Sequence, residues 1–208
     1  MALKSSTSVS TSGSSGSSNV PWVALAGLGV LDLTRVLAGP VCAMMLGDMG
    51  ADVIQVEPVG TGDDTRTWGP PFLGGESAYF LGVNRNKRGI TPNMAVAAGQ
   101  QILAALIEKS DVLVDNFRTG TLARWGFDAA WFEQHARRVI RCSITGYGTT
   151  GPKAAMPGYD FILQAESGLM SICGDPDGEP MKYGVAIVDL CTGMLACNAI
   201  LGAINARS

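Results

Sequence analysis

The chain has 208 residues, of which 47% are hydrophobic and 16% are charged, and its formal net charge is −3. This composition is typical of a soluble globular domain long enough to bury a sizeable core. A nucleic-acid partner is not expected, because nucleic-acid binding needs a clustered basic face. The five cysteines form no C-x-x-C pair and there is one histidine, so metal binding at a structural zinc site is not expected either.

The amino-terminal end differs in composition from the rest of the chain. Residues 5–18 are almost all Ser, Thr and Gly, and such a segment cannot bury enough apolar surface to become ordered. We therefore expect a disordered leader over residues 1–20 and a folded domain over residues 21–208. The leader is Ser-rich and acid-poor like a transit peptide but lacks the arginines of one. Both a mitochondrial and a cytoplasmic location stay open.

Apolar patterning from Gly29 onward predicts alternating strands and helices. The expected strands are Val30–Leu33, Asp52–Glu57, Val112–Asp115 and Val139–Ser143. A loop rich in Gly and Pro is expected from the second strand to Gly75, and helices are expected over Val41–Met49, Ala95–Lys109, parts of Leu122–Arg138, and Phe161–Ser167. Strands separated by helices indicate an α/β fold, a Rossmann-like parallel sheet with helices on both faces.

The last expected helix, Leu190–Ala206, is apolar and rich in small residues. A bilayer span needs about 20 clean apolar residues, and Asn198 interrupts this segment. The pattern favours a buried helix, and no membrane partner is expected.

Glycines and prolines near the first strand suggest two different turns. Gly27 and Gly29 precede the strand, whereas a dinucleotide-binding fingerprint follows it, so they indicate a plain turn. After the strand, Gly39 permits a tight turn and Pro40 suits the first position of the next helix. That helix start could face an anionic ligand, or the segment could be an ordinary connection.

Charged residues cluster in two predicted loops. Asp63 and Asp64 lack the further ligands that a metal would need, and a salt bridge to Arg66 is the favoured interpretation. The run of Arg85, Lys87 and Arg88 could grip a phosphate or form a solvated turn.

Two aspartates stand at predicted helix starts, Asp160 and Asp189. Each could simply cap its helix. For Asp189 a helix start would also favour the ionised carboxylate, which is the nucleophilic form. His135 lies in a charged surface segment, so histidine-dependent nucleophilic catalysis is poorly supported.

Several motifs in order go further than these patterns. From about Gly29 to its end the chain resembles the class III (CaiB/BaiF) coenzyme A transferase family, through the segments VLDLTRVLAGP, LGDMGADVIQVEPVGTGDDTRTWGPPF, NRNKRGI, DVLVDNFRTGTLARWGF, CSITGYGTTGP, GYD and VAIVDLCTG. The first two look most similar to the branch that moves CoA between succinyl-CoA and glutarate or hydroxymethylglutarate.

The resemblance implies a large Rossmann-like domain plus a small domain, with two chains interlocked as a homodimer. It also implies that Asp189 is the nucleophile, which forms an anhydride with the acyl group and then a thioester with CoA. The substrates would be an acyl-CoA and a small carboxylic acid, with no permanently bound cofactor. Because family members are about twice as long as this chain, we expect an amino-terminal part of the fold, incomplete relative to the two-domain interlocked fold.

Residue by residue, the resemblance places CoA contacts at Val36, Leu37, Ala38, Asn116, Phe117, Arg118 and Arg124. Tyr159 and Asp160 would line the acyl site. Racemases of the family have a histidine base at the position of Tyr159, and a phenol is a poor base at neutral pH, so transfer is favoured over racemisation.

Three positions depart from the pattern of some family members. Leu37 replaces the glutamine of formyl-CoA transferases, so oxalate and formate are not expected as substrates. Pro58 and Ala95 replace basic CoA contacts. A catalytically silent chain that binds CoA or a full-length partner is the alternative to an active transferase.

Overall fold

A computed structural model describes residues 23–207 of the chain. Its centre is a parallel sheet of five strands in the order β5-β2-β1-β6-β7. The strands are β1 (Gly29–Asp32), β2 (Asp52–Val56), β5 (Lys87–Ile90), β6 (Val112–Asp115) and β7 (Ile140–Ser143). The predicted α/β class and four of these strands are confirmed, with ends that differ by one residue. The expected leader lies outside the described residues.

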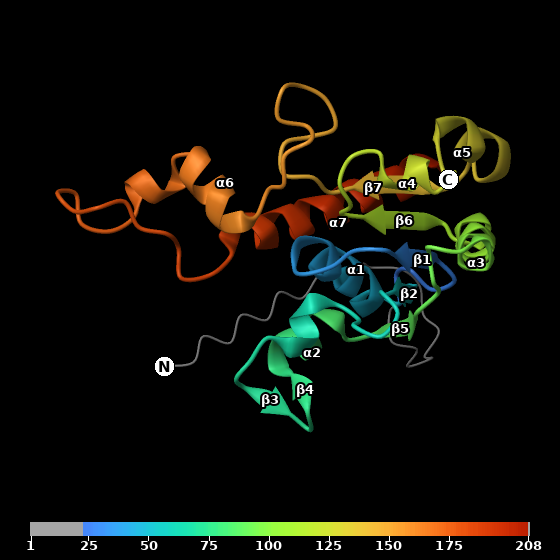
Figure 1. Cartoon of the computed structure of the whole chain (residues 1–208), viewed down its shortest axis with the longest axis horizontal. Coiled ribbons are helices and arrows are strands. Elements are labelled where there is room, and N and C mark those ends of the chain that lie inside the picture. Colours follow the sequence, from blue (N-terminus) through green and yellow to red (C-terminus); the bar gives the residue numbers. More distant parts are fainter. Residues whose placement is uncertain (1–22, 208) are drawn as a thin grey trace, which may run out of the picture.

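Helices cover both faces of this sheet, as the alternation predicts (Figure 1). On one face lie α1 (Ala38–Asp48) and α7 (Ile187–Arg207); on the other lie α3 (Ala97–Lys109), α4 (Thr121–Arg124) and α5 (Ala129–His135). Neighbouring residues of one strand point to opposite faces. Val30 of β1 accordingly packs with α1 and α7, whereas Leu31 packs with α3 and α5.

Two segments extend away from this layered body (Figure 1). The first contains the 3-10 helix η1 (Asp64–Thr67), the hairpin strands β3 (Phe72–Leu73) and β4 (Glu76–Ser77), and α2 (Ala78–Asn84). The second contains α6 (Asp160–Glu166) and η2 (Leu169–Ile172). The expected loop to Gly75 therefore holds short elements, and α2 and β5 were not predicted.

The basic run at residues 85–88 begins as the expected solvated turn, with Arg85 exposed, but Lys87 departs from it. Lys87 lies in β5 with its side chain 1% exposed, and its ammonium is 2.8 Å from the fully buried Asp32 carboxylate. Arg85 pairs with Asp48, and Arg88 pairs with Asp52 at 2.6 Å. Each base is thus paired with an aspartate: Arg85 with one at the end of α1, Lys87 with one at the end of β1, and Arg88 with one in β2.

Arg66 does not bridge to Asp63 or Asp64. Its guanidinium lies 2.7 Å from Glu57 and 3.1 Å from Glu76. This pairing lowers the pKa of Glu57, chiefly through the hydrogen bond from Arg66. Asp63 is buried and instead accepts a hydrogen bond from Thr65 N–H at the start of η1.

Helix α7 is buried on one face only. Its buried residues are Gly193, Ala196, Cys197 and Ile200, while Leu195 is 66% exposed. By length and composition alone, α7 is the one helix among residues 23–207 that could cross a membrane, with 17% of its apolar window buried. The expectation of a buried helix is therefore correct for the face that packs on α1.

Candidate active site

The candidate site lies at the carboxyl edge of the sheet, between β1 and β6. From β1 the chain proceeds to β2 and β5 on one side, whereas β6 and β7 lie on the other. The loops that follow β1 and β6 therefore diverge, and this is where open parallel sheets bind their ligands.

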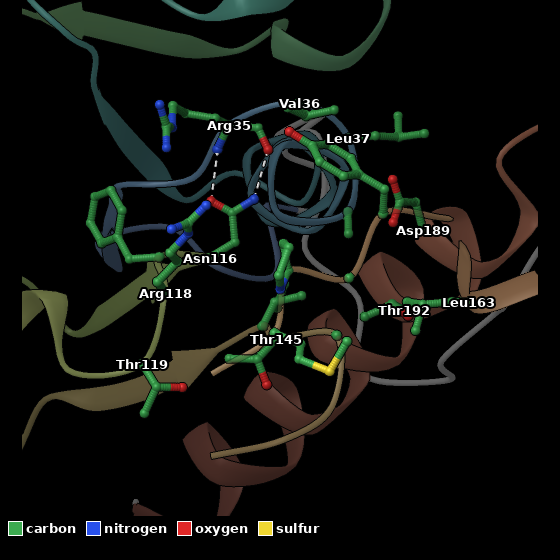
Figure 2. Close-up of a pocket in the computed structure, with 18 of the residues that line it drawn as sticks. Arg35, Val36, Leu37, Asn116, Arg118, Thr119, Thr145, Leu163, Asp189 and Thr192 are labelled. Carbon is green, nitrogen blue, oxygen red and sulfur yellow. Dashed lines mark hydrogen bonds between the residues drawn. The ribbon is translucent and has the colours of Figure 1, made fainter. Parts of the chain in front are cut away.

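Asn116 joins these two diverging loops. Its Oδ1 accepts a hydrogen bond from Arg35 N–H at 3.0 Å, and its Nδ2 donates to the Arg35 carbonyl at 2.7 Å (Figure 2). The next residue, Val36, has a φ of 72°, which is a strained conformation for a β-branched residue. Val36 N–H donates to Asp63 Oδ2 at 3.1 Å. Two side chains from distant segments therefore hold this turn in its strained shape.

Helix α1 begins at Ala38, earlier than predicted, so Pro40 is its third residue and not its first. The start of α1 packs closely against α7. A Cβ built on Gly193 would lie 2.5 Å from the Ala38 carbonyl oxygen. A side chain at Gly193 would push the helices apart, so glycine is needed there for close contact. Because Gly193 is one helical turn after Asp189, this contact brings Asp189 to the loop after β1.

An open pocket of about 340 Å³ occupies this place. Its wall includes eight of the residues inferred from resemblance: Val36, Leu37, Ala38, Asn116, Phe117, Arg118, Tyr159 and Asp189. Asn116 and Arg118 lie on one side of it, and Asp189 and Thr192 lie on the other (Figure 2). Two inferred residues are outside this wall. Arg124 donates a hydrogen bond to Thr121 Oγ1, and Asp160 is buried.

Asp160 caps α7 rather than its own helix α6. The N-cap residue of α6 is Tyr159. Asp160 Oδ1 accepts hydrogen bonds from Val188 N–H at 2.8 Å and Asp189 N–H at 3.1 Å. These are the second and third residues of α7, whose N–H groups an N-cap side chain ordinarily satisfies. Asp189 is therefore not the cap of its helix, and its carboxylate lies on the pocket wall.

Burial raises the pKa of Asp189 to about 6, and repulsion by the Asp160 carboxylate adds to the effect. The expected effect of the helix start, which favours the ionised form, is therefore outweighed in the pKa of Asp189 by desolvation. At neutral pH most Asp189 side chains are still ionised, because the pH exceeds the pKa by about one unit.

A second pocket of about 510 Å³ adjoins the first and is mostly apolar. Arg35, Phe117 and Arg118 line both pockets. The wall of the second also includes Val56, Pro58, Val59, Met94, Ala95, Leu103 and Trp125. Two arginines thus line both an apolar cavity and the pocket that contains Asp189. The departures noted at Pro58 and Ala95 both lie in this wall.

Sequence reasoning missed Arg35 on the pocket wall and Tyr79, which responds to the charges near the pocket. Tyr79 lies on α2, where burial and the charges of Asp189, Asp160 and Asp63 raise its pKa. Its ring packs 5.2 Å from that of Trp68. The signal for α2 was present, because Ser77 precedes the helix and accepts a hydrogen bond from Phe80 N–H as an N-cap. No triad of His, Cys, Asp or Glu among residues 23–207 is arranged to hold a metal ion.

Comparison with known proteins agrees with this arrangement. Residues 25–208 match the model of CoA-transferase family III. The chain is 50% identical over 183 residues to succinyl-CoA:glutarate CoA-transferase of Mus musculus, covering 88% of this chain and 42% of that protein. It is 47% identical over 186 residues to succinate–glutarate CoA-transferase of Agrobacterium fabrum, covering 86% and 46%.

Solved structures give the same result. A CaiB/BaiF family protein from Brucella suis superposes with a TM-score of 0.84 at 44% identity, covering 91% of this chain and 50% of that chain. The described fold therefore corresponds to about half of that structure. The chain spans less than half the length of the curated relatives above.

Proposed function

The chain belongs to CoA-transferase family III, and from this we propose that it transfers coenzyme A from an acyl-CoA to a carboxylic acid, with Asp189 as nucleophile. The observation that carries the proposal is the position of the Asp189 carboxylate. It lies on the wall of a pocket at the switch point of the sheet, and another residue performs the capping of its helix.

In each step of the chemistry, either a carboxylate displaces a thiolate from an acyl carbon or a thiolate displaces a carboxylate. A carboxylate oxygen of Asp189 attacks the thioester carbon of the donor, the C–S bond breaks, and CoA thiolate leaves a mixed anhydride. The thiolate then attacks the aspartyl carbonyl and expels the donor acid, which gives an aspartyl-CoA thioester. The acceptor carboxylate attacks the aspartyl carbonyl and expels CoA thiolate, which gives a second mixed anhydride. The thiolate then attacks the acceptor's carbonyl carbon and expels the Asp189 carboxylate, so that the new acyl-CoA forms.

The two adjoining pockets suit the two ends of a CoA thioester. The thioester would occupy the pocket with Asp189, and the heterocyclic base would enter the apolar pocket. Arg35 and Arg118, which line both, would contact the phosphates between these ends, since guanidinium groups bind phosphate oxygens in pairs. Arg124 would need to turn away from Thr121 to contribute.

The proposed donor is succinyl-CoA and the proposed acceptor is a glutarate-like dicarboxylate, which is supported by the names of the two relatives above. Tyr159 lines the pocket with its side chain largely exposed, and its hydroxyl would contact the acyl group. Racemisation is less well supported, because no histidine lines this pocket. A homodimer and a mitochondrial location complete the proposal.

The direct test is to incubate the purified chain with succinyl-CoA and glutarate and to measure glutaryl-CoA by chromatography. Asp189→Asn keeps the size of the side chain and removes the nucleophilic oxygen, so we expect turnover to be lost while CoA binding persists. Trapping with hydroxylamine during turnover should label one aspartate, which peptide mass analysis locates. A label on Asp160 or Asp115, or wild-type turnover by Asp189→Asn, would refute the mechanism.

The alternative is a chain that binds CoA without turnover, and it is kept because the chain spans less than half of its curated relatives. Calorimetric titration with CoA separates the two. Binding without glutaryl-CoA, under conditions where a full-length relative gives product, would support the alternative.

A further inference from the structure

Resting on the proposed role of Asp189, we propose that Asp160 is a positioning residue. Its single carboxylate holds the first turn of α7 and places a negative charge against the nucleophile. This differs from the contact with the acyl group that resemblance implied for Asp160, since Asp160 is not part of the pocket wall.

The first turn of α7 has no cap of its own. The residue before the helix is Ala186, whose carbonyl accepts from Leu190 N–H at 3.1 Å, and alanine has no side-chain acceptor. Ile187 N–H donates to the Val185 carbonyl at 2.9 Å. The N–H groups of the next two residues both donate to Asp160 Oδ1. Without Asp160 these two donors would lose their partner.

Gln164 holds the Asp160 carboxylate in place through a hydrogen bond. It is 1% exposed and lies one turn along α6. Its Nε2 donates to Asp160 Oδ2 and to the Val185 carbonyl, and its Oε1 accepts from Tyr183 N–H at 2.9 Å. The segment that leads into α7 is therefore tied to the same helix that supplies the cap. Asp160 and Gln164 together set where Asp189 stands relative to the pocket.

The charge of Asp160 also acts on Asp189, in addition to the hydrogen bonds that Asp160 accepts. Asp160 is the neighbouring charge that raises the pKa of Asp189, after burial. The other titratable groups around the site are Tyr79 on α2 and, on the pocket wall, Arg35, Asp64, Arg118 and Tyr159. The start of α1 contributes only Leu37 and Ala38 to that wall. A test must therefore separate the charge of Asp160 from its cap.

Two substitutions make that separation. Asp160→Asn retains an oxygen that can accept from Val188 and Asp189 but removes the charge, whereas Asp160→Ala removes both. The matched control is Asp128→Asn on α5, where Asp128 caps a helix through Trp131 N–H and lies outside the pocket wall. The readout is carbon-13 NMR of aspartate carboxyls in the whole chain, with the Asp189 resonance assigned from Asp189→Asn.

We expect Asp189 to titrate near 6 in the wild type and in Asp128→Asn. In Asp160→Asn the midpoint should fall but remain above the ordinary value of 3.8, because burial persists. In Asp160→Ala the amides of Val188 and Asp189 should also exchange faster with solvent, and in Asp160→Asn they should not. An unchanged midpoint in Asp160→Asn would overturn the electrostatic part, and unchanged exchange in Asp160→Ala would overturn the capping part.

A wild-type measurement keeps the proposal testable if both variants fail to fold. In the wild type the Val188 and Asp189 amides both donate to Asp160 Oδ1, so their protons should exchange slowly with solvent. Exchange of both at the rate of amides without a hydrogen bond would overturn the proposal. None of these measurements needs turnover, so they stand or fall separately from the glutaryl-CoA assay.

Discussion

Asp189 sits where two unfavourable effects on a carboxylate coincide. It is half-buried, and the Asp160 carboxylate lies close enough to raise its pKa further. In the folded chain its pKa is about 6, compared with 3.8 for an ordinary aspartate. Below pH 3.8 Asp189 is protonated in both the folded and the unfolded states, so its titration does not change the free energy of unfolding. As the pH rises through this interval the unfolded state loses its proton first, and the fold is destabilised until the pH exceeds 6.

Asp189→Asn should therefore stabilise the fold at pH 7 and have little effect at pH 4. After discounting for the screening of a half-exposed group, we expect a gain of about 1 kcal/mol at pH 7. The measurement is thermal unfolding of both proteins at the two pH values. The exposed Asp128→Asn is a control that should show no such pH-dependent gain. If Asp189→Asn is less stable than the wild type at pH 7, burial and the Asp160 charge do not disfavour this carboxylate as described.

At the scale of elements, the position of Asp189 depends on the contact between α1 and α7. Gly193→Ala would place a methyl group 2.5 Å from the Ala38 carbonyl oxygen. The helices must move apart to accept it, at a cost of about 1–3 kcal/mol, and the turn of α7 that carries Asp189 should move with them. We expect a lower melting temperature and weaker CoA binding.

Gly202 offers a control within the same helix. A Cβ at Gly202 meets nothing within 4 Å, and alanine has a higher helix propensity than glycine. Gly202→Ala should raise stability by about 0.5–1 kcal/mol. Equal effects of the two substitutions on melting temperature would show that the close contact is not the determining factor.

The elements that sequence patterns predicted are those with a local signal. Val30–Leu33 and Val112–Asp115 are short apolar runs, and their strands lie at or within one residue of the predicted bounds. The β5 strand was missed because Lys87 looks like a surface residue in sequence. Its partner Asp32 is 55 residues away, and no local pattern encodes that pairing.

The candidate site likewise contains residues that the sequence identified and one contact that it did not. Family resemblance named eight residues that meet in one pocket, because ordered motifs follow the strands whose ends meet at one edge of the sheet. The cap of α7 could not be predicted, since Asp160 and the amides it binds are 28 and 29 residues apart. A local rule assigned each aspartate to the helix it begins, whereas tertiary packing assigned Asp160 to a different helix.

At the scale of the whole molecule, the segment that carries α6 and η2 combines two properties. It supplies Asp160 to the site and extends away from the sheet (Figure 1), and it exposes several apolar side chains. These include Met156, Tyr159, Phe161, Ile162, Ile172, Met181 and Val185. On α7, Met194 and Leu195 add to the exposed apolar surface. Apolar patches of this kind favour association between molecules.

We therefore expect the purified chain to self-associate, so that its sedimentation coefficient rises with concentration. Ile172 is 78% exposed and Leu195 is 66% exposed, so Ile172→Gln and Leu195→Gln should weaken association with little loss of core packing. Ile102→Gln is the matched control, because Ile102 is 49% exposed but lies on α3, on the opposite face of the sheet. If association depends on these surfaces, the control should sediment like the wild type.

A wild-type chain that sediments as one monomeric species at every concentration would contradict the prediction. Equal weakening of association by all three substitutions would indicate non-specific hydrophobic association, in which case α6, η2 and α7 do not form a specific contact surface.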